Sequence, residues 1–200
     1  MDGTTLGIII AVAVVIVIIL LIAFFVSRRR KAQRQEEQRE RTRDEFGSEY
    51  DRTAEKHGSE EDAEKELRER RGRVERQVEP LSNESRGRYE EQWGEVERVF
   101  VDNPERSIEM ADRTVSDMLS ERNFVSDASQ SDSETERSLA VMHPDVADDY
   151  REARRIRADV VAHSTRGSDE ESGGASEETT EELRQAIRKY RAVYERLMER

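Results

Sequence analysis

The sequence lacks cysteine, and it contains only three prolines and one tryptophan among 200 residues. Without cysteine the chain forms no disulfide and offers no thiolate to a metal ion. Aromatic residues make up 6% of the chain, whereas charged residues make up 40% and leave a net charge of −12. These shortages exclude a disulfide-stabilised fold and predict a small hydrophobic core surrounded by solvated charge.

Charged side chains are absent from one long stretch, residues 6–26, which holds 21 residues. As a helix it would be about 31 Å long, enough to cross a hydrocarbon core of about 30 Å. The stretch therefore predicts a transmembrane helix over residues 6–26. A cleaved signal peptide is the alternative, but it needs a basic leader and a shorter apolar run that ends in small residues. Here the leader carries Asp2 and no basic residue, and the run ends in Phe-Phe-Val.

Basic residues are missing before the apolar run and frequent after it, at Arg28, Arg29, Arg30, Lys31 and Arg34. Because basic residues beside a membrane helix stay on the cytoplasmic side, residues 1–5 are expected outside and the rest of the chain inside. The predicted location is the cell membrane, crossed once. This basic collar should also attract anionic lipid headgroups, by about 1 kcal/mol per residue.

The two sides of residue 44 differ in charge. Residues 27–44 hold eight Arg/Lys against four Asp/Glu, a net charge of +4, and residues 45–200 hold 26 against 41, a net charge of −15. The acidic part mainly indicates solubility, and it should repel nucleic acid. Residues 27–79 are interpreted as the basic collar followed by a charged, coiled-coil-like stalk, helical in parts and broken near Gly47 and Gly58. The stalk lacks sustained apolar heptads, and Pro80 ends it.

Residues 80–200 change character and form the predicted cytoplasmic domain. No segment alternates apolar and polar residues with a period of two, so the fold class is all-α, a small bundle of about four amphipathic helices. Ser82 is the expected N-cap of the first helix, and Asn103 caps the second, with Pro104 in its first turn. Pro144 opens the third helix, and a Thr at 179 or 180 opens the fourth.

The first and fourth helices of this domain carry the candidate core or partner face. Apolar residues recur there at helical spacing. The face consists of Tyr89, Trp93, Val96 and Phe100 in the first helix and Leu183, Ile187, Tyr190, Tyr194 and Leu197 in the fourth. The fourth helix either closes the bundle over Trp93 and Phe100 or docks elsewhere, and a core this thin favours closure. A protein partner or a second copy of the chain would complete such a core.

Two segments rich in Ser, Asp, Glu and Gly, near residues 126–138 and 166–177, are expected to be flexible acidic loops. Neither they nor the helices carry a recognisable phosphate-binding, nucleophile or zinc motif. His57, His143 and His163 lie far apart without metal-binding spacing, and their expected roles are a linker residue, a helix cap and a cation at a helix C-terminus. The sequence therefore predicts no enzyme, no cofactor, no metal site and no small-molecule substrate.

Three segments resemble a known family: "VFVDNPERSIEMADRTVSDML", "HPDVADDYREARRI" and "TTEELRQAIRKYRAVYERLM". In this order, behind an anchor and a charged stalk, they are similar to a family of uncharacterised single-pass membrane proteins of actinobacteria. The resemblance covers roughly residues 40 to 200. It implies the architecture described above and transfers no catalytic residue, since the family carries no established activity.

These observations favour a membrane-tethered cytoplasmic helical module that binds another protein as an adaptor or scaffold. Two alternatives remain open: a structural stalk subunit of a membrane complex, and a regulator whose basic collar responds to lipid charge.

Overall fold

The structure, a computed structural model, describes residues 36–124, 132–166 and 177–199. The predicted transmembrane helix 6–26 and the basic residues of the collar, 28–34, lie outside the described residues. Within those three ranges, every helix is too short or too polar to span a lipid bilayer.

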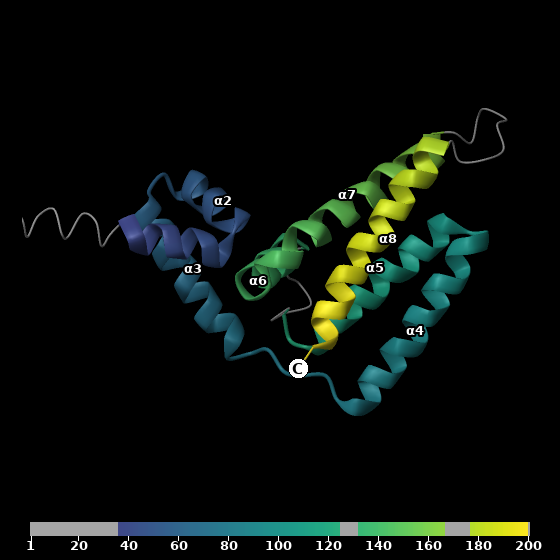
Figure 1. Cartoon of the computed structure of the whole chain (residues 1–200), viewed down its shortest axis with the longest axis horizontal. Coiled ribbons are helices and arrows are strands. Elements are labelled where there is room, and N and C mark those ends of the chain that lie inside the picture. Colours follow the sequence, from purple (N-terminus) through teal and green to yellow (C-terminus); the bar gives the residue numbers. More distant parts are fainter. Residues whose placement is uncertain (1–35, 125–131, 167–176, 200) are drawn as a thin grey trace, which may run out of the picture. The chain divides into compact units, whose positions relative to one another are not determined.

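The chain divides into two compact units, Met1–Asp44 and Glu45–Arg200. In the first unit, the described residues 36–44 are helical. In the second, the described residues form helices and no strand (Figure 1). The helices are α2 Ser48–His57, α3 Glu60–Glu75, α4 Asn83–Asp102, α5 Pro104–Glu121, α6 Asp132–Met142, α7 Pro144–Arg166 and α8 Glu177–Met198. The all-α prediction is confirmed for this part of the chain.

Side-chain caps fix the starts of α4 and α5. The Ser82 hydroxyl accepts a hydrogen bond from the Ser85 backbone N–H at 3.0 Å. The Asn103 side-chain oxygen accepts one from the Arg106 N–H, also at 3.0 Å, and Pro104 is the first residue of α5. Each cap satisfies a backbone donor that has no partner inside the helix. Both predicted helix starts are confirmed.

Glycines separate the first helices of the second unit. Gly47 and Gly58 have φ angles of 52° and 69°, a backbone region that glycine adopts without steric cost. Gly58 also donates its N–H to the Ala54 carbonyl at 2.9 Å, which ends α2. The expected breaks at these glycines are therefore present.

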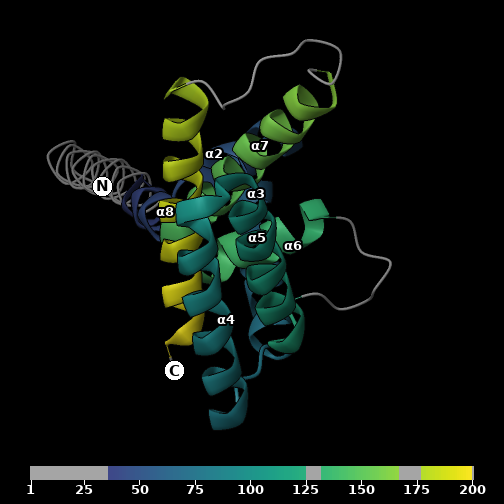
Figure 2. The same cartoon turned by 90° about the vertical axis from the view of Figure 1, so that its right-hand side faces the viewer.

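The last helix is an integral part of the core. Helix α8 packs mainly on α7 and α5, and α4 packs on α5 (Figure 2). Its side chains at Leu183, Tyr190 and Leu197 are fully buried, together with Val115 and Met118 of α5. The amphipathic face that the sequence assigned to α8 thus contributes to the same core as the preceding helices.

Residues 45–79 lie in the same compact unit as residues 80–200 and are not a separate stalk. The prediction placed a domain boundary at Pro80, but Phe46, Tyr50, Leu67 and Val74 are buried in the shared core. The apolar stripe of α3 is thin, yet it is covered because α3 packs against both α2 and α6. Phe46 and Tyr50 lie on either side of Gly47, outside the α3 stripe, and they supply the bulk that the stripe lacks.

Part of the first predicted loop is helical. Helix α6 begins at Asp132, within the expected loop 126–138, and residues 125–131 lie outside the described residues. The acidic residues at its start favour a helix N-terminus, and Leu139 and Val141 are buried. The second unit therefore has five described helices after residue 80, where the sequence predicted about four.

The second predicted loop, 166–177, lies outside the described residues except for its two end residues, which are helical. Helix α7 reaches Arg166 and α8 already begins at Glu177, before the Thr predicted to cap it. Glu177 and Glu178 precede that Thr and favour the start of a helix, because negative charge stabilises the N-terminal turn. Residues 167–176 lie outside the described residues.

A buried arginine joins the end of α8 to two other segments. Arg122 follows α5 and donates to the Leu197 carbonyl at 2.8 Å and to the Glu79 carbonyl at 3.3 Å. Burial lowers the pKa of its guanidinium, and the nearby positive charge of Arg86 adds to the effect. The bond to Leu197 satisfies a carbonyl in the last turn of α8, which has no partner within the helix.

Candidate functional site

Most of the predicted partner face is core. Tyr89, Trp93 and Val96 are buried on α4, and Leu183, Tyr190, Tyr194 and Leu197 are buried on α8. The rings of Trp93 and Tyr194 stack with centroids 4.5 Å apart and planes 15° from parallel. Phe100 and Ile187 are only partly buried and pack at the edge of the core. These two residues are the members of the predicted face that a partner can reach.

The polar atoms of Trp93, Tyr190 and Tyr89 are satisfied within the unit. Trp93 donates to Glu97 at 2.8 Å, and the Tyr190 hydroxyl donates to Asp112 at 2.9 Å. The Tyr89 hydroxyl donates to Glu121 at 2.8 Å. Burial, reinforced by that carboxylate, raises the pKa of Tyr89 to about 12. These hydrogen bonds hold the aromatic rings in place and leave none of these phenols ionised at neutral pH.

Two grooves open beside the partly buried residues. The first, of about 290 Å³, lies between α4 and α8, with Phe100 and Ile187 in it and Glu97, Arg188 and Arg191 around them. The second, of about 200 Å³, lies between α5, α7 and α8. Its apolar residues are Ile108, Val160, Val161 and Leu183, and its charged residues are Glu105, Glu109 and Arg157. Both grooves combine an apolar floor with a charged rim.

Exposed apolar side chains accompany these grooves. Among the described residues, the large hydrophobic side chains that are exposed are Val101, at 82%, and Val161, at 43%. Val101 follows Phe100 at the end of α4, and Val161 lines the second groove near the end of α7. Val101 lies at the end of α4, where the chain turns into α5, and Val161 lies in the last part of α7.

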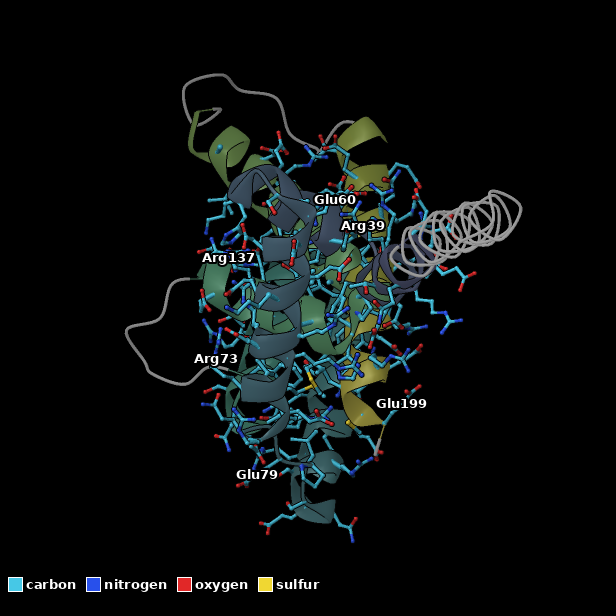
Figure 3. All side chains as sticks on the ribbon, turned by 90° about the vertical axis from the view of Figure 1, so that its left-hand side faces the viewer. Arg39, Glu60, Arg73, Glu79, Arg137 and Glu199 are labelled. Atoms are coloured by element: carbon cyan, nitrogen blue, oxygen red, sulfur yellow. The ribbon has the colours of Figure 1, made fainter. Side chains whose placement is uncertain are left out.

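Charge covers most of the remaining described surface (Figure 3). Many of its ion pairs are exposed, such as Arg155 with Glu152 at 2.7 Å and Arg184 with Glu181 at 3.5 Å. Pairs of this kind stabilise a fold by about 0–1 kcal/mol each, because water and salt screen them. Against this background, the grooves flanked by Val101 and Val161 are the candidate functional site, which we call the valine end.

The sequence contained a signal for only part of this site. Phe100 and Ile187 belonged to the predicted face, whereas Val101 was not singled out, because it follows the stripe by one residue and points away from the core. Val160 and Val161 lie on α7 and were not part of the predicted face. Which stripe residues remain accessible depends on how α5, α7 and α8 meet, and helical spacing does not contain that information.

The histidines do not form a site in the described residues. No group of three or more His, Cys, Asp or Glu side chains in those residues is arranged to hold a metal ion. His57 is the last residue of α2, and the side chain of His163 lies outside the described part. His143 stands between α6 and α7, where its ring contacts Phe124 with centroids 5.9 Å apart.

Burial lowers the pKa of His143 to about 4, and the positive charges of Arg122 and Arg196 add to the effect. Its Nε2 is buried and finds no hydrogen-bond partner among the described residues. An unfolded histidine has a pKa of about 6.5. Between pH 4 and pH 6.5, His143 is therefore protonated in the unfolded chain but neutral in the folded protein. The contribution of His143 to stability is therefore complete above pH 6.5 and decreases as the pH falls toward 4.

We expect the free energy of unfolding at pH 5 to be lower than at pH 7.5, with about 1–2 kcal/mol of the difference due to His143. The measurement is urea unfolding of residues 45–200 at the two pH values. His143→Gln cannot titrate in this range and should lose less stability than the parent protein. His57→Gln, at an exposed position, is the control and should follow the parent. Equal losses in all three proteins would show that His143 is not responsible.

No family model, curated protein or solved structure matches this chain. The resemblance to actinobacterial membrane proteins therefore stays a prediction from the sequence.

Proposed function

We propose that this chain is a membrane-tethered protein-interaction module, an adaptor or scaffold without catalytic activity of its own. Residues 6–26 are its anchor, and residues 45–200 face the cytoplasm and bind a partner protein at the valine end. The observation that carries the proposal is the pairing of two apolar grooves with the exposed side chains of Val101 and Val161.

Exposed apolar side chains beside a groove favour binding, because covering them releases them from water at about 25 cal/mol per Å². The grooves are narrow and bounded by helices, and such grooves accept the apolar face of an amphipathic helix. Their rims carry charge of both signs, with Arg188 and Arg191 on one and Glu105 and Glu109 on the other. A partner helix with complementary charges would be oriented by these rims.

The membrane part of the proposal rests on the sequence. The apolar run 6–26 has the length of a bilayer span, and basic residues flank it on one side only. Anchoring confines the module to a thin layer at the membrane and raises its effective concentration toward a partner there. The packing of residues 45–79 into the helical unit favours this role over a structural stalk subunit, because an extended charged helix is what a stalk would require.

Site-specific crosslinking in membranes tests the proposal. A photoreactive amino acid is placed at position 101 or 161 of the full chain, and at position 73 as the control. Arg73 is about as exposed, at 51%, but lies on α3. We expect a product of defined mass from positions 101 and 161 and none from position 73.

A second substitution makes the test sharper. Val101→Asp should reduce the crosslinked product at position 161 by about tenfold, since it places a charge where an apolar contact forms. The fold should be unchanged because Val101 is exposed, and circular dichroism checks this. The proposal is wrong if Val101→Asp leaves the amount of crosslinked product at position 161 unchanged, or if position 73 gives the same product.

A further inference from the structure

A cavity of about 330 Å³, separate from the two grooves, lies among α2, α3, α6 and α7. Its lining is mainly charged, whereas the grooves contain apolar residues. Two carboxylates line it, Glu49 and Glu136, together with the hydroxyls of Thr53 and Ser133. Its cationic residues outnumber the carboxylates: Arg52, Lys56, Arg70, Arg137 and Arg151. Such a concentration of cations is unexpected in a unit whose net charge is −15.

Two of these arginines, Arg70 and Arg151, are held in place by the buried carboxylate of Glu49. The side chain of Glu49 is 7% exposed, and it pairs with Arg151 at 2.6 Å and with Arg70 at 3.6 Å. Burial raises the pKa of Glu49, so the neighbouring arginines recover only part of the cost of desolvating its charge. This contact fixes the two guanidinium groups before any ligand arrives, which lowers the entropic cost of binding one.

The other cations are easily released for a ligand. Arg52 pairs with Asp148 at 3.0 Å, and Arg137 pairs with Glu134 at 3.0 Å. Both carboxylates are substantially exposed, at 51% and 37%. Exposed pairs contribute about 0–1 kcal/mol, so a ligand can displace Glu134 from Arg137 at little cost, whereas Asp148 is also held by Arg151 at 2.6 Å. Lys56 makes no ion pair with any described residue and is available directly.

Two further features favour an anion. The Nε of Arg70 is buried and has no hydrogen-bond partner among the described residues, although Arg70 lines the cavity. Ser133 lies in the first turn of α6, and the N-terminal turn of a helix carries partial positive charge. Arg137, labelled in Figure 3, belongs to the same helix and lies on the face shown there.

We propose that this cavity binds a phosphate monoester. A guanidinium presents paired N–H donors that match the oxygens of a phosphate, and a lysine supplies a further point charge. The cavity exceeds the volume of one phosphate group, which leaves room for part of the esterified molecule. Long polyanions such as nucleic acid are disfavoured, because the acidic surface around the cavity repels them.

Binding would connect parts of the fold that are distant in sequence. The ligand would contact α2 through Lys56, α3 through Arg70 and α6 through Arg137. A ligand that binds only the folded state raises its stability in proportion to the logarithm of its concentration. The cavity would thereby make the stability of the helical unit depend on a phosphorylated molecule, independently of the valine end.

Calorimetric titration of the full chain in detergent micelles tests the proposal, with glycerol 3-phosphate as the probe at constant ionic strength. We expect saturable binding to the parent protein. The double variant Lys56→Gln/Arg137→Gln should bind at least about tenfold more weakly, since it loses two charge-assisted contacts. Arg113→Gln/Arg184→Gln removes the same charge from exposed positions on α5 and α8, and should bind as the parent does. Circular dichroism verifies that both variants are folded.

Short-chain phosphatidic acid, titrated into the same micelles, identifies the source of the phosphate group, because the proposed anchor and basic collar would hold the full chain to vesicles whether or not the cavity is occupied. Binding of this lipid that the Lys56→Gln/Arg137→Gln variant loses, and the control keeps, would assign a lipid headgroup. Binding of glycerol 3-phosphate alone, lost in the same variant, would assign a soluble ester. Absence of saturable binding to both probes overturns the proposal, as does equal binding by the two double variants.

Discussion

Deleting residues 177–200 is expected to unfold the helical unit. The deletion removes the whole of α8, whose buried side chains include Leu183, Ala186, Tyr190, Val193 and Leu197. Burial of a large apolar side chain contributes about 1.5–3 kcal/mol, and a domain of this kind is stable by about 5–15 kcal/mol in total. Several such contributions are lost together, so the remainder cannot keep its fold.

The deletion also leaves the surfaces of α5 and α7 without cover and removes the carbonyl that accepts the hydrogen bond from Arg122. Loss of this acceptor costs further stability, because the buried guanidinium keeps only its hydrogen bond to the Glu79 carbonyl. Urea unfolding followed by circular dichroism on residues 45–200, with and without α8, measures the effect. We expect a cooperative transition in the parent and none in the truncated protein.

Gln185→Ala is a suitable control, because position 185 is exposed on the same helix and should tolerate the change within about 0.5 kcal/mol. A truncated protein that keeps its cooperative transition would show that α8 is a docking element and not part of the core.

Trp93→Ala should lower the free energy of unfolding by about 3–5 kcal/mol. Trp93 is 5% exposed, and its ring stacks on Tyr194. Its removal creates a cavity between α4 and α8 and leaves one face of the Tyr194 ring without contacts. The substitution also removes the donor to Glu97, but that carboxylate is exposed and water replaces the bond.

Unfolding of Trp93→Ala is followed by circular dichroism, since the chain has no other tryptophan for fluorescence. Trp93→Phe keeps a ring at this position and should lose clearly less stability. Val101→Ala, at an exposed position of the same helix, should be nearly neutral. A loss below about 1 kcal/mol for Trp93→Ala would mean that the stack with Tyr194 does not hold α4 to α8.

The expected losses of stability are large because the core consists of few apolar side chains. The apolar faces of α4 and α8 were recognisable in the sequence, as were the caps at Ser82 and Asn103. Caps and amphipathic faces depend on residues within about one turn of each other, and such local patterns are visible without a structure. The breaks at Gly47 and Gly58 were recognisable for the same reason.

The sequence was less informative about α2, α3 and α6. The stripe of α3 is too thin to identify as buried, and α6 begins in a segment whose composition is typical of a loop. Helix α3 is covered by α2 and α6, and α2 and α6 in turn pack on α7. Their burial is a property of the assembled unit, since a weakly apolar helix becomes core only when its neighbours enclose it.

The two candidate sites show the same division. The apolar residues of the valine end come from several helices. The charged residues of the proposed phosphate-binding cavity do so too, with Lys56 on α2 and Arg137 on α6. By itself, the sequence determined the helical fold class, the starts of α4 and α5, and the faces of α4 and α8. Tertiary structure alone decided which of those residues remain accessible and which cations converge, because both depend on contacts between helices far apart in the chain.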